Sequence, residues 1–175
     1  NSIVYHAARD EVMMSVRSFS EVWVIDHSLS TEEARGSAGD LLYRWGNPQA
    51  YGQGTQADRI LYYQHDARWL DDNDPDSLLT VFSNGSLRHQ IEQSYLIKFA
   101  FPEEWMTDDN QFQPVAIVWQ SETDLFAVNM SGGQSLANNH ALITLAPDGR
   151  FVEITENSDI VWDYISPIYR ETNEG

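Results

Sequence analysis

The chain has 175 residues, 42% of them hydrophobic and 12% aromatic, which is typical of a folded domain with a sizeable core and not of a disordered chain. Its formal net charge of −17 repels phosphate backbones and anionic lipid, so nucleic acid and membrane surfaces are not expected partners. It contains no cysteine, which excludes disulfides, thiol catalysis and zinc–thiolate sites.

Hydrophobic residues alternate with a period of two almost throughout the chain, which predicts an all-β protein. We expect three sets of four strands, at 2–5, 11–16, 22–26 and 41–45, at 62–70, 78–83, 94–101 and 114–120, and at 133–136, 141–145, 151–155 and 160–164. Turn-forming segments separate them. Residues 31–34 predict at most one helical turn, with Ser30 or Thr31 as its cap.

The three sets resemble one another. Each ends on an apolar strand with a tryptophan (Trp45, Trp119, Trp162), and each has a tight turn near its middle, as at 84–85 and 147–149. Four-stranded units that repeat every roughly 40 to 60 residues are typical of propeller blades. We therefore predict one partial β-propeller domain over 1–175, with blades at approximately 1–48, 59–120 and 131–167. A β-sandwich of the same strands is the alternative. Three blades are too few to close a ring, so either they belong to a larger propeller or their open edges are covered by something outside this chain.

Long polar insertions interrupt the strands at 28–40, 47–58, 71–76 and 105–110. In a propeller, insertions of this kind collect at the strand ends, where the binding face lies. The acidic segment 71–74 suggests calcium, but it lacks the glycine and the distal glutamate of an EF-hand loop. We interpret it as a solvated acidic turn and predict neither a metal site nor a cofactor.

Several short motifs occur in order along nearly the whole chain. They are Asn-Ser-Ile-Val-Tyr at 1–5, Ser-Val-Arg-Ser-Phe-Ser-Glu-Val-Trp-Val-Ile-Asp-His at 15–27, Gly-Asp-Leu-Leu-Tyr-Arg-Trp-Gly-Asn-Pro at 39–48, Gln-His-Asp at 64–66, Ser-Gly-Gly-Gln at 131–134, and Gly-Arg-Phe at 149–151 before Ile-Val-Trp at 160–162. As an ordered set they resemble the bacterial arylsulfotransferase (aryl-sulfate sulfotransferase) family, although no single motif is decisive.

This resemblance implies a six-bladed propeller that moves a sulfuryl group from an aryl sulfate donor to a phenolic acceptor. It implies no nucleotide sulfate donor and no cofactor, and a periplasmic or secreted location. The chain is then expected to be the C-terminal part of the propeller, completed by N-terminal blades that are missing here or by another copy in a homo-oligomer.

The resemblance also assigns site residues. The family's transiently sulfated histidine falls on His65, and its sulfate-binding arginine falls on Arg17. Asn1 falls on the asparagine of a His-x-Asn-Ser motif whose histidine would lie just before Asn1. That histidine and another from an earlier blade are absent, so the expected active-site set is incomplete in this chain.

The chemistry of these residue types suits such a transfer. A neutral imidazole, with an ordinary pKa of about 6.5, can attack the sulfuryl ester and then act as a good leaving group, which gives two successive displacements. The transferred group is anionic throughout, and the planar guanidinium of Arg17 suits it better than the ammonium of Lys98. The substrate-binding candidates Tyr63 and Phe19, together with Tyr62, are aromatic residues near strand ends that can stack on an aryl ring.

Structural roles stand beside these functional ones. His65 is either the nucleophile or an ordinary histidine of a strand, and Arg17 either binds the sulfuryl group or pairs with Glu21 or Asp26. The remaining histidines show no paired spacing and are expected at the surface or in structural roles; they are His6, His27, His89 and His140.

Three further expectations concern neighbouring segments. Arg44 is expected to form a structural ion pair and a stacking contact. Residues 46–48 are expected to fix the conformation of a loop. Asn84 and Arg88 could approach the same face as His65. Two other functions remain open, a non-catalytic binding or scaffold module and an aryl sulfate hydrolase that uses the same pocket.

Overall fold

The computed structural model describes residues 1–88 and 91–168, and its twelve strands form three four-stranded antiparallel sheets. The first sheet is β1 (Ile3–His6), β2 (Glu11–Val16), β3 (Glu21–Asp26) and β4 (Tyr43–Trp45). The second sheet is β5 (His65–Trp69), β6 (Leu79–Ser83), β7 (Tyr95–Ala100) and β8 (Ala116–Gln120). The third sheet is β9 (Gly132–Ser135), β10 (Ala141–Leu145), β11 (Arg150–Ile154) and β12 (Ile160–Ile165).

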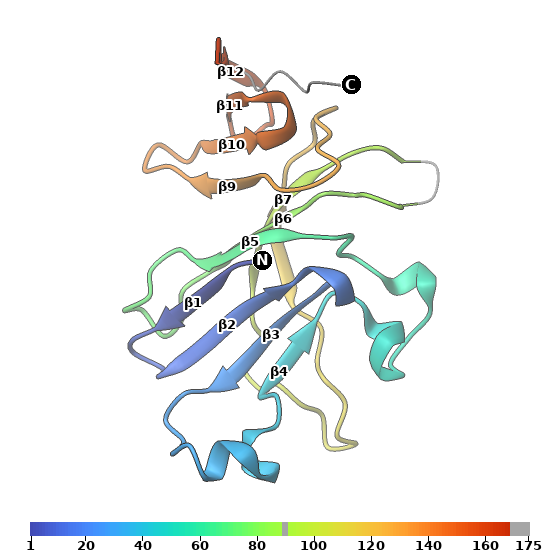
Figure 1. Cartoon of the computed structure of the whole chain (residues 1–175), viewed down its shortest axis with the longest axis vertical. Coiled ribbons are helices and arrows are strands. Elements are labelled where there is room, and N and C mark those ends of the chain that lie inside the picture. The colour runs from blue at the N-terminus through green and yellow to red at the C-terminus, as the bar shows by residue number, and fades with distance from the viewer. Residues whose placement is uncertain (89–90, 169–175) are drawn as a thin grey trace, which may run out of the picture.

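Each sheet is a meander in which strands that follow one another in the chain pair with one another. The three sheets lie next to one another, with β5–β8 between the other two (Figure 1). The first strand of the middle sheet, β5, contacts β1 and β2 on one side and β9 on the other. This is the arrangement of propeller blades, and the three blades do not close a ring. The predicted all-β fold of about three four-stranded blades is confirmed, and the β-sandwich alternative is wrong.

The hydrophobic core has two parts, one on each side of the middle sheet. Between the first and second sheets it includes Val24, Trp45 and Val81, and between the second and third it includes Phe82 and Ile143. All five residues of β6 are buried, because both faces of this strand are covered by neighbouring sheets. Burial on both faces also explains why two successive residues of β6, Val81 and Phe82, are both apolar, which breaks a strict alternation.

Two of the expected turns have a different form in the structure. The helical turn lies at Glu33–Arg35 as a short 3-10 helix, and Ser30 donates to the Glu33 carboxylate with both its N–H and its O–H. The prediction of a tight Asn-Gly turn at 84–85 is wrong, because β6 ends at Ser83 and β7 begins only at Tyr95. The turn at 147–149 is confirmed, and Gly149 supplies the left-handed backbone (φ 60°) that ends it.

Within residues 1–88 and 91–168, no helix has the length and apolar character that crossing a membrane requires.

Candidate active site

His65 is the first residue of β5, and its side chain is buried, with 8% of its surface exposed. The backbone around it is unusual, since Tyr63 (φ 54°) and Asp66 (φ 57°) both adopt the left-handed conformation. The pairing between β5 and β6 also shifts by one residue between His65 and Arg68, which is a β-bulge. Bulges redirect side chains from the regular alternation of a strand, and they are over-represented next to active sites.

Hydrogen bonds determine which nitrogen of His65 carries the proton. Nδ1 lies 2.7 Å from Oδ1 of Asn84 and 3.1 Å from the carbonyl oxygen of Tyr63. Because both partners only accept hydrogen bonds, Nδ1 must be the protonated nitrogen. Nε2 therefore keeps its lone pair, and it accepts a hydrogen bond from Nδ2 of Asn1 at 2.8 Å.

The orientation of the Asn84 side chain follows from its other contacts. Its Nδ2 group donates to the carbonyl oxygens of Ala127 (2.8 Å) and Met130 (3.0 Å), so its Oδ1 must face His65. Asn84 is completely buried, and it links the imidazole to the segment that leads into β9. The sequence suggested that Asn84 could approach the same face as His65, but not that it contacts the ring directly.

Residues of the first sheet fix the backbone just before His65. Gln64 is buried, and its Nε2 group donates to Oγ of Ser15 (3.2 Å) and to the carbonyl oxygen of Glu21 (2.7 Å). Oγ of Ser20 accepts a hydrogen bond from the backbone N–H of Tyr63 at 3.1 Å. The histidine is thus positioned at a joint between two sheets, and contacts from both sheets hold it.

Arg17 lies in a short 3-10 helix, Arg17–Phe19, that follows β2, and its guanidinium carbon is 4.6 Å from the centre of the Tyr63 ring. The expected alternative, pairing with Glu21, is wrong. Glu21 is buried and instead accepts two hydrogen bonds from Arg44, each at 2.8 Å. Within the described residues, no carboxylate lies within 4 Å of Arg17, so its charge is available to a ligand.

The other candidates differ in their surroundings. Tyr63 joins the site through its carbonyl oxygen and through the cation–π contact with Arg17. Phe19 is half exposed, and its ring lies 5.2 Å from the ring of Trp23. The predicted structural role of Arg44 is confirmed by its ion pair with Glu21.

Burial is the main cause that lowers the pKa of His65 below its ordinary value. The positive charge of Arg17 lowers the pKa further. The hydrogen bonds to Asn84 and to the carbonyl of Tyr63 act in the opposite direction, because they favour the protonated ring. The net shift is downward, so the imidazole is neutral at neutral pH and its Nε2 atom is nucleophilic.

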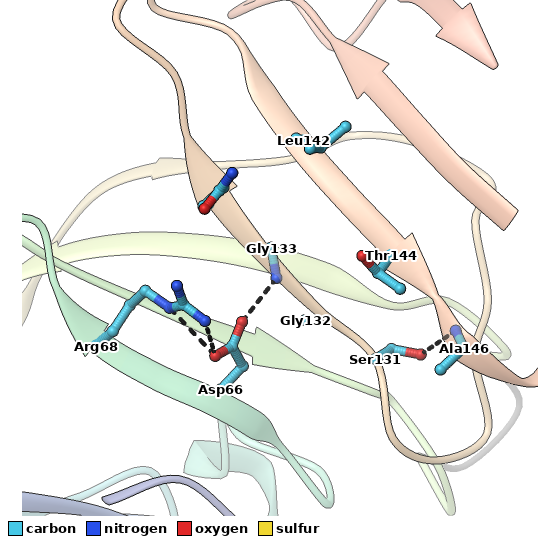
Figure 2. Close-up of a pocket in the computed structure, with 9 residues that line it drawn as sticks. Asp66, Arg68, Ser131, Gly132, Gly133, Leu142, Thr144 and Ala146 are labelled. Atoms are coloured by element: carbon cyan, nitrogen blue, oxygen red, sulfur yellow. Dashed lines mark hydrogen bonds and ion pairs between the residues drawn. The ribbon is translucent and has the colours of Figure 1, made fainter. Parts of the chain in front are cut away.

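A cavity of about 420 Å³ lies on the other side of β5, between this strand and β9 and β10. Figure 2 shows that Asp66 and Arg68 form one wall and are ion-paired, and that Asp66 also accepts a hydrogen bond from the backbone N–H of Gly133 at 3.1 Å. A Cβ atom on Gly132 would lie 2.3 Å from Oδ2 of Asp66, so only glycine fits there. This contact brings the second and third sheets close together beside the histidine.

The other described histidines have structural partners, as expected. His27 pairs with Asp10 (2.7 Å), His140 pairs with Glu153 (2.6 Å), and His6 is buried with its Nε2 atom 3.1 Å from a backbone carbonyl oxygen. His89 lies outside the described residues. Over residues 1–88 and 91–168, there is no group of three or more His, Cys, Asp or Glu side chains that could hold a metal ion.

Comparison with known proteins gives one positive result. The family model described as Arylsulfotransferase (ASST) matches residues 1–167, a range that includes every side chain of the site around His65. No curated protein matches the sequence at a significant level.

Proposed function

The chain belongs to the arylsulfotransferase family, and on this basis we propose that it transfers a sulfuryl group from an aryl sulfate to a phenol through a sulfated His65. The observation that carries the proposal is the state of this histidine. Its ring is neutral, its proton is held at Nδ1 by Asn84, and its Nε2 lone pair accepts a hydrogen bond from the side chain of Asn1.

The first displacement begins when the Nε2 lone pair of His65 attacks sulfur. The N–S bond forms, the bond between sulfur and the aryl oxygen breaks, and the phenolate leaves with that electron pair. The ring keeps its Nδ1 proton and becomes positively charged, and the hydrogen bond to Oδ1 of Asn84 stabilises this charge. In the second displacement a phenol oxygen attacks sulfur, loses its proton to solvent, and the N–S electron pair returns to Nε2.

Arg17 and Asn1 have complementary roles in this scheme. Arg17 offers a guanidinium with no carboxylate partner among the described residues, and such a group binds the oxygens of a sulfuryl group through several donors at once. The Nδ2 group of Asn1 donates to the lone pair that must attack, so it has to move aside. Once displaced, this amide is close enough to donate to a sulfuryl oxygen.

The test is peptide mass mapping of the chain after brief exposure to an aryl sulfate, with an alkaline quench that protects the N–S bond. We expect the mass of one sulfuryl group on the peptide that contains His65, and no adduct in a His65→Ala variant that keeps its circular dichroism spectrum. His27→Ala is the matched control, because His27 is exposed and paired with Asp10, and it should leave the adduct unchanged.

An adduct on another residue, or turnover retained in His65→Ala, would contradict the proposal. A folded chain without any adduct would favour the binding-module function. If His65 is sulfated but the group passes only to water when phenol is added, the protein is a hydrolase.

A further inference from the structure

Arginine and tyrosine side chains alternate in a continuous row that begins beside His65. We call it the Arg–Tyr row, and in spatial order it consists of Arg17, Tyr63, Arg59, Tyr62, Arg88 and Tyr95. Each arginine lies over at least one of the rings, and every member of the row is half-buried except Tyr62, which is buried.

The distances along the row are those of cation–π contacts. The guanidinium carbon of Arg59 is 4.3 Å from the ring centre of Tyr62 and 5.9 Å from that of Tyr63. The guanidinium carbon of Arg88 is 4.8 Å from the ring centre of Tyr62 and 4.7 Å from that of Tyr95. Contacts of this length partly offset the charge of each arginine but do not neutralise it.

The arginines of the row lack the carboxylate partners that four other arginines of this chain have. Arg9, Arg44, Arg68 and Arg150 are each ion-paired with a carboxylate. Within residues 1–88 and 91–168, no carboxylate lies within 4 Å of the three arginines of the row. This is unexpected in a chain with 27 acidic and 10 basic residues, because carboxylates are abundant.

The hydrogen bonds of the row do not supply negative charge either. Arg59 donates to the carbonyl oxygen of Leu61 (2.9 Å) and to Oγ of Ser20 (2.5 Å). Arg88 donates to the carbonyl oxygen of Ile60 at 3.4 Å. All three acceptors are neutral, so three positive charges stand in one half-buried row and repel one another. A bound anion would relieve this repulsion.

We infer that the Arg–Tyr row is a second anion subsite, which holds an acidic substituent of the aryl substrate while Arg17 holds the sulfuryl end. The substrate class is then aromatic dianions, meaning aryl sulfates that carry a further sulfonate, sulfate or carboxylate on the ring system. The orientation of this substrate rests on the proposed function, whereas the anion subsite itself does not.

The test is equilibrium binding to the chain of sulfonates, whose C–S bond cannot transfer a sulfuryl group. Isothermal titration calorimetry at fixed ionic strength compares benzenesulfonate with para-benzenedisulfonate and with the longer biphenyl disulfonate. We expect the better disulfonate to bind about five- to tenfold more tightly than the monosulfonate, as a charge-assisted contact at a half-buried site allows. Arg88→Gln should remove this preference with little effect on benzenesulfonate, and Arg88→Lys should retain most of it.

The matched control is Arg35→Gln, which removes the same charge from an exposed turn far from the row in sequence. It should leave the preference unchanged. Equal affinity of the wild-type chain for all three ligands would overturn the inference, as would an equal loss in Arg35→Gln and Arg88→Gln, which would point to the general field of the protein. A sulfated His65 without a disulfonate preference would contradict the subsite alone, whereas an Arg88-dependent preference without a sulfated His65 would contradict only the proposed function.

Discussion

At the scale of single residues, the site depends on how one asparagine holds one imidazole. Oδ1 of Asn84 accepts the Nδ1 proton of His65, and two backbone carbonyls prevent the amide from turning over. The nitrogen that keeps its lone pair, Nε2, is therefore set by the fold, and in the proposed reaction it is selected before any substrate binds. Such preorganisation costs nothing at the moment of reaction, because the supporting groups are already in place.

The pH dependence of His65 sulfation tests this role of Asn84. In the wild-type chain burial lowers the pKa of His65, so the rate should be constant at high pH and fall only at a pH below about 6.5. Asn84→Ala removes a hydrogen bond that raises this pKa, so the inflection should move to still lower pH. The rate on the plateau should fall about 10- to 100-fold, because the ring loses its orientation.

The measurement is the initial rate of adduct formation between pH 5 and pH 8.5, together with an NMR titration of the His65 ring. Asn84→Ala also leaves the carbonyls of Ala127 and Met130 without a donor, and a loss of stability of about 1–3 kcal/mol is expected. A rate loss with an unshifted inflection would indicate a purely structural role for Asn84.

The site residues were predictable from sequence to different degrees. The family resemblance pointed to His65 and Arg17 as site residues, since they lie at fixed places in ordered motifs, and their roles stay predictions. Arg17 was also open to pairing with Glu21, and only the fold shows that Arg44, from another strand, takes that carboxylate. The contact of Asn84 with His65 joins the start of β5 to the residue that follows β6, and the Asn-Gly pair at 84–85 has the signature of a hairpin turn.

At the scale of elements, the strand pattern was read correctly where residues alternate or form apolar runs. The largest difference is at the start of β5, which was expected at 62 and begins at His65. Tyr63 has a left-handed backbone, and the backbone N–H groups of Tyr62 and Tyr63 donate to the hydroxyls of Ser83 and Ser20. These residues therefore do not pair with β6 as part of the sheet. Aromatic residues favour strands locally, but here tertiary contacts override that propensity.

The contact between β5 and β9 leads to a prediction about Gly132. Gly132→Ala would place a methyl group 2.3 Å from Oδ2 of Asp66, so the bond between Asp66 and the N–H of Gly133 has to break or the strands must separate. We expect a loss in unfolding free energy of about 2 kcal/mol, as for overpacking elsewhere in tight interiors. Urea unfolding followed by tryptophan fluorescence measures it.

Gly36→Ala is the control for this substitution. Its added methyl group would meet only the carbonyl oxygen of Glu33, at an ordinary 3.4 Å, and the backbone of Gly36 is at a negative φ of −97°. Its stability should stay within about 0.5 kcal/mol of the wild type. Equal effects of the two substitutions would show that the sheet contact has no special importance for stability.

At the scale of the whole molecule, the main electrostatic fact is the net charge of −17. Most acidic side chains lie in exposed loops, such as 71–76, where they bond to nearby backbone N–H groups. Charges of one sign repel one another in the compact state and destabilise it relative to the unfolded chain. The Arg–Tyr row, in contrast, is a local concentration of the opposite sign, so the field near His65 differs from the field of the protein as a whole.

The salt dependence of stability should report this repulsion. Raising sodium chloride from about 0.01 M to about 0.15 M shortens the screening length from about 30 Å to about 8 Å. We expect the thermal unfolding midpoint to rise by a few degrees, and to rise equally in choline chloride, because the effect is general screening. An unchanged or lower midpoint would mean that repulsion among the acidic residues does not limit stability.

The middle sheet has its two faces in separate cores. Along β6, Val81 packs towards the first sheet and Phe82, the next residue, packs towards the third. The same interleaving occurs in β7, where Leu96 and Ile97 belong to different cores. Alternate residues of each of these strands must therefore fit two different cores, one at the odd-numbered positions and one at the even-numbered positions. During evolution, alternate residues of a single strand should covary with different blades, one set with the first blade and the other set with the third.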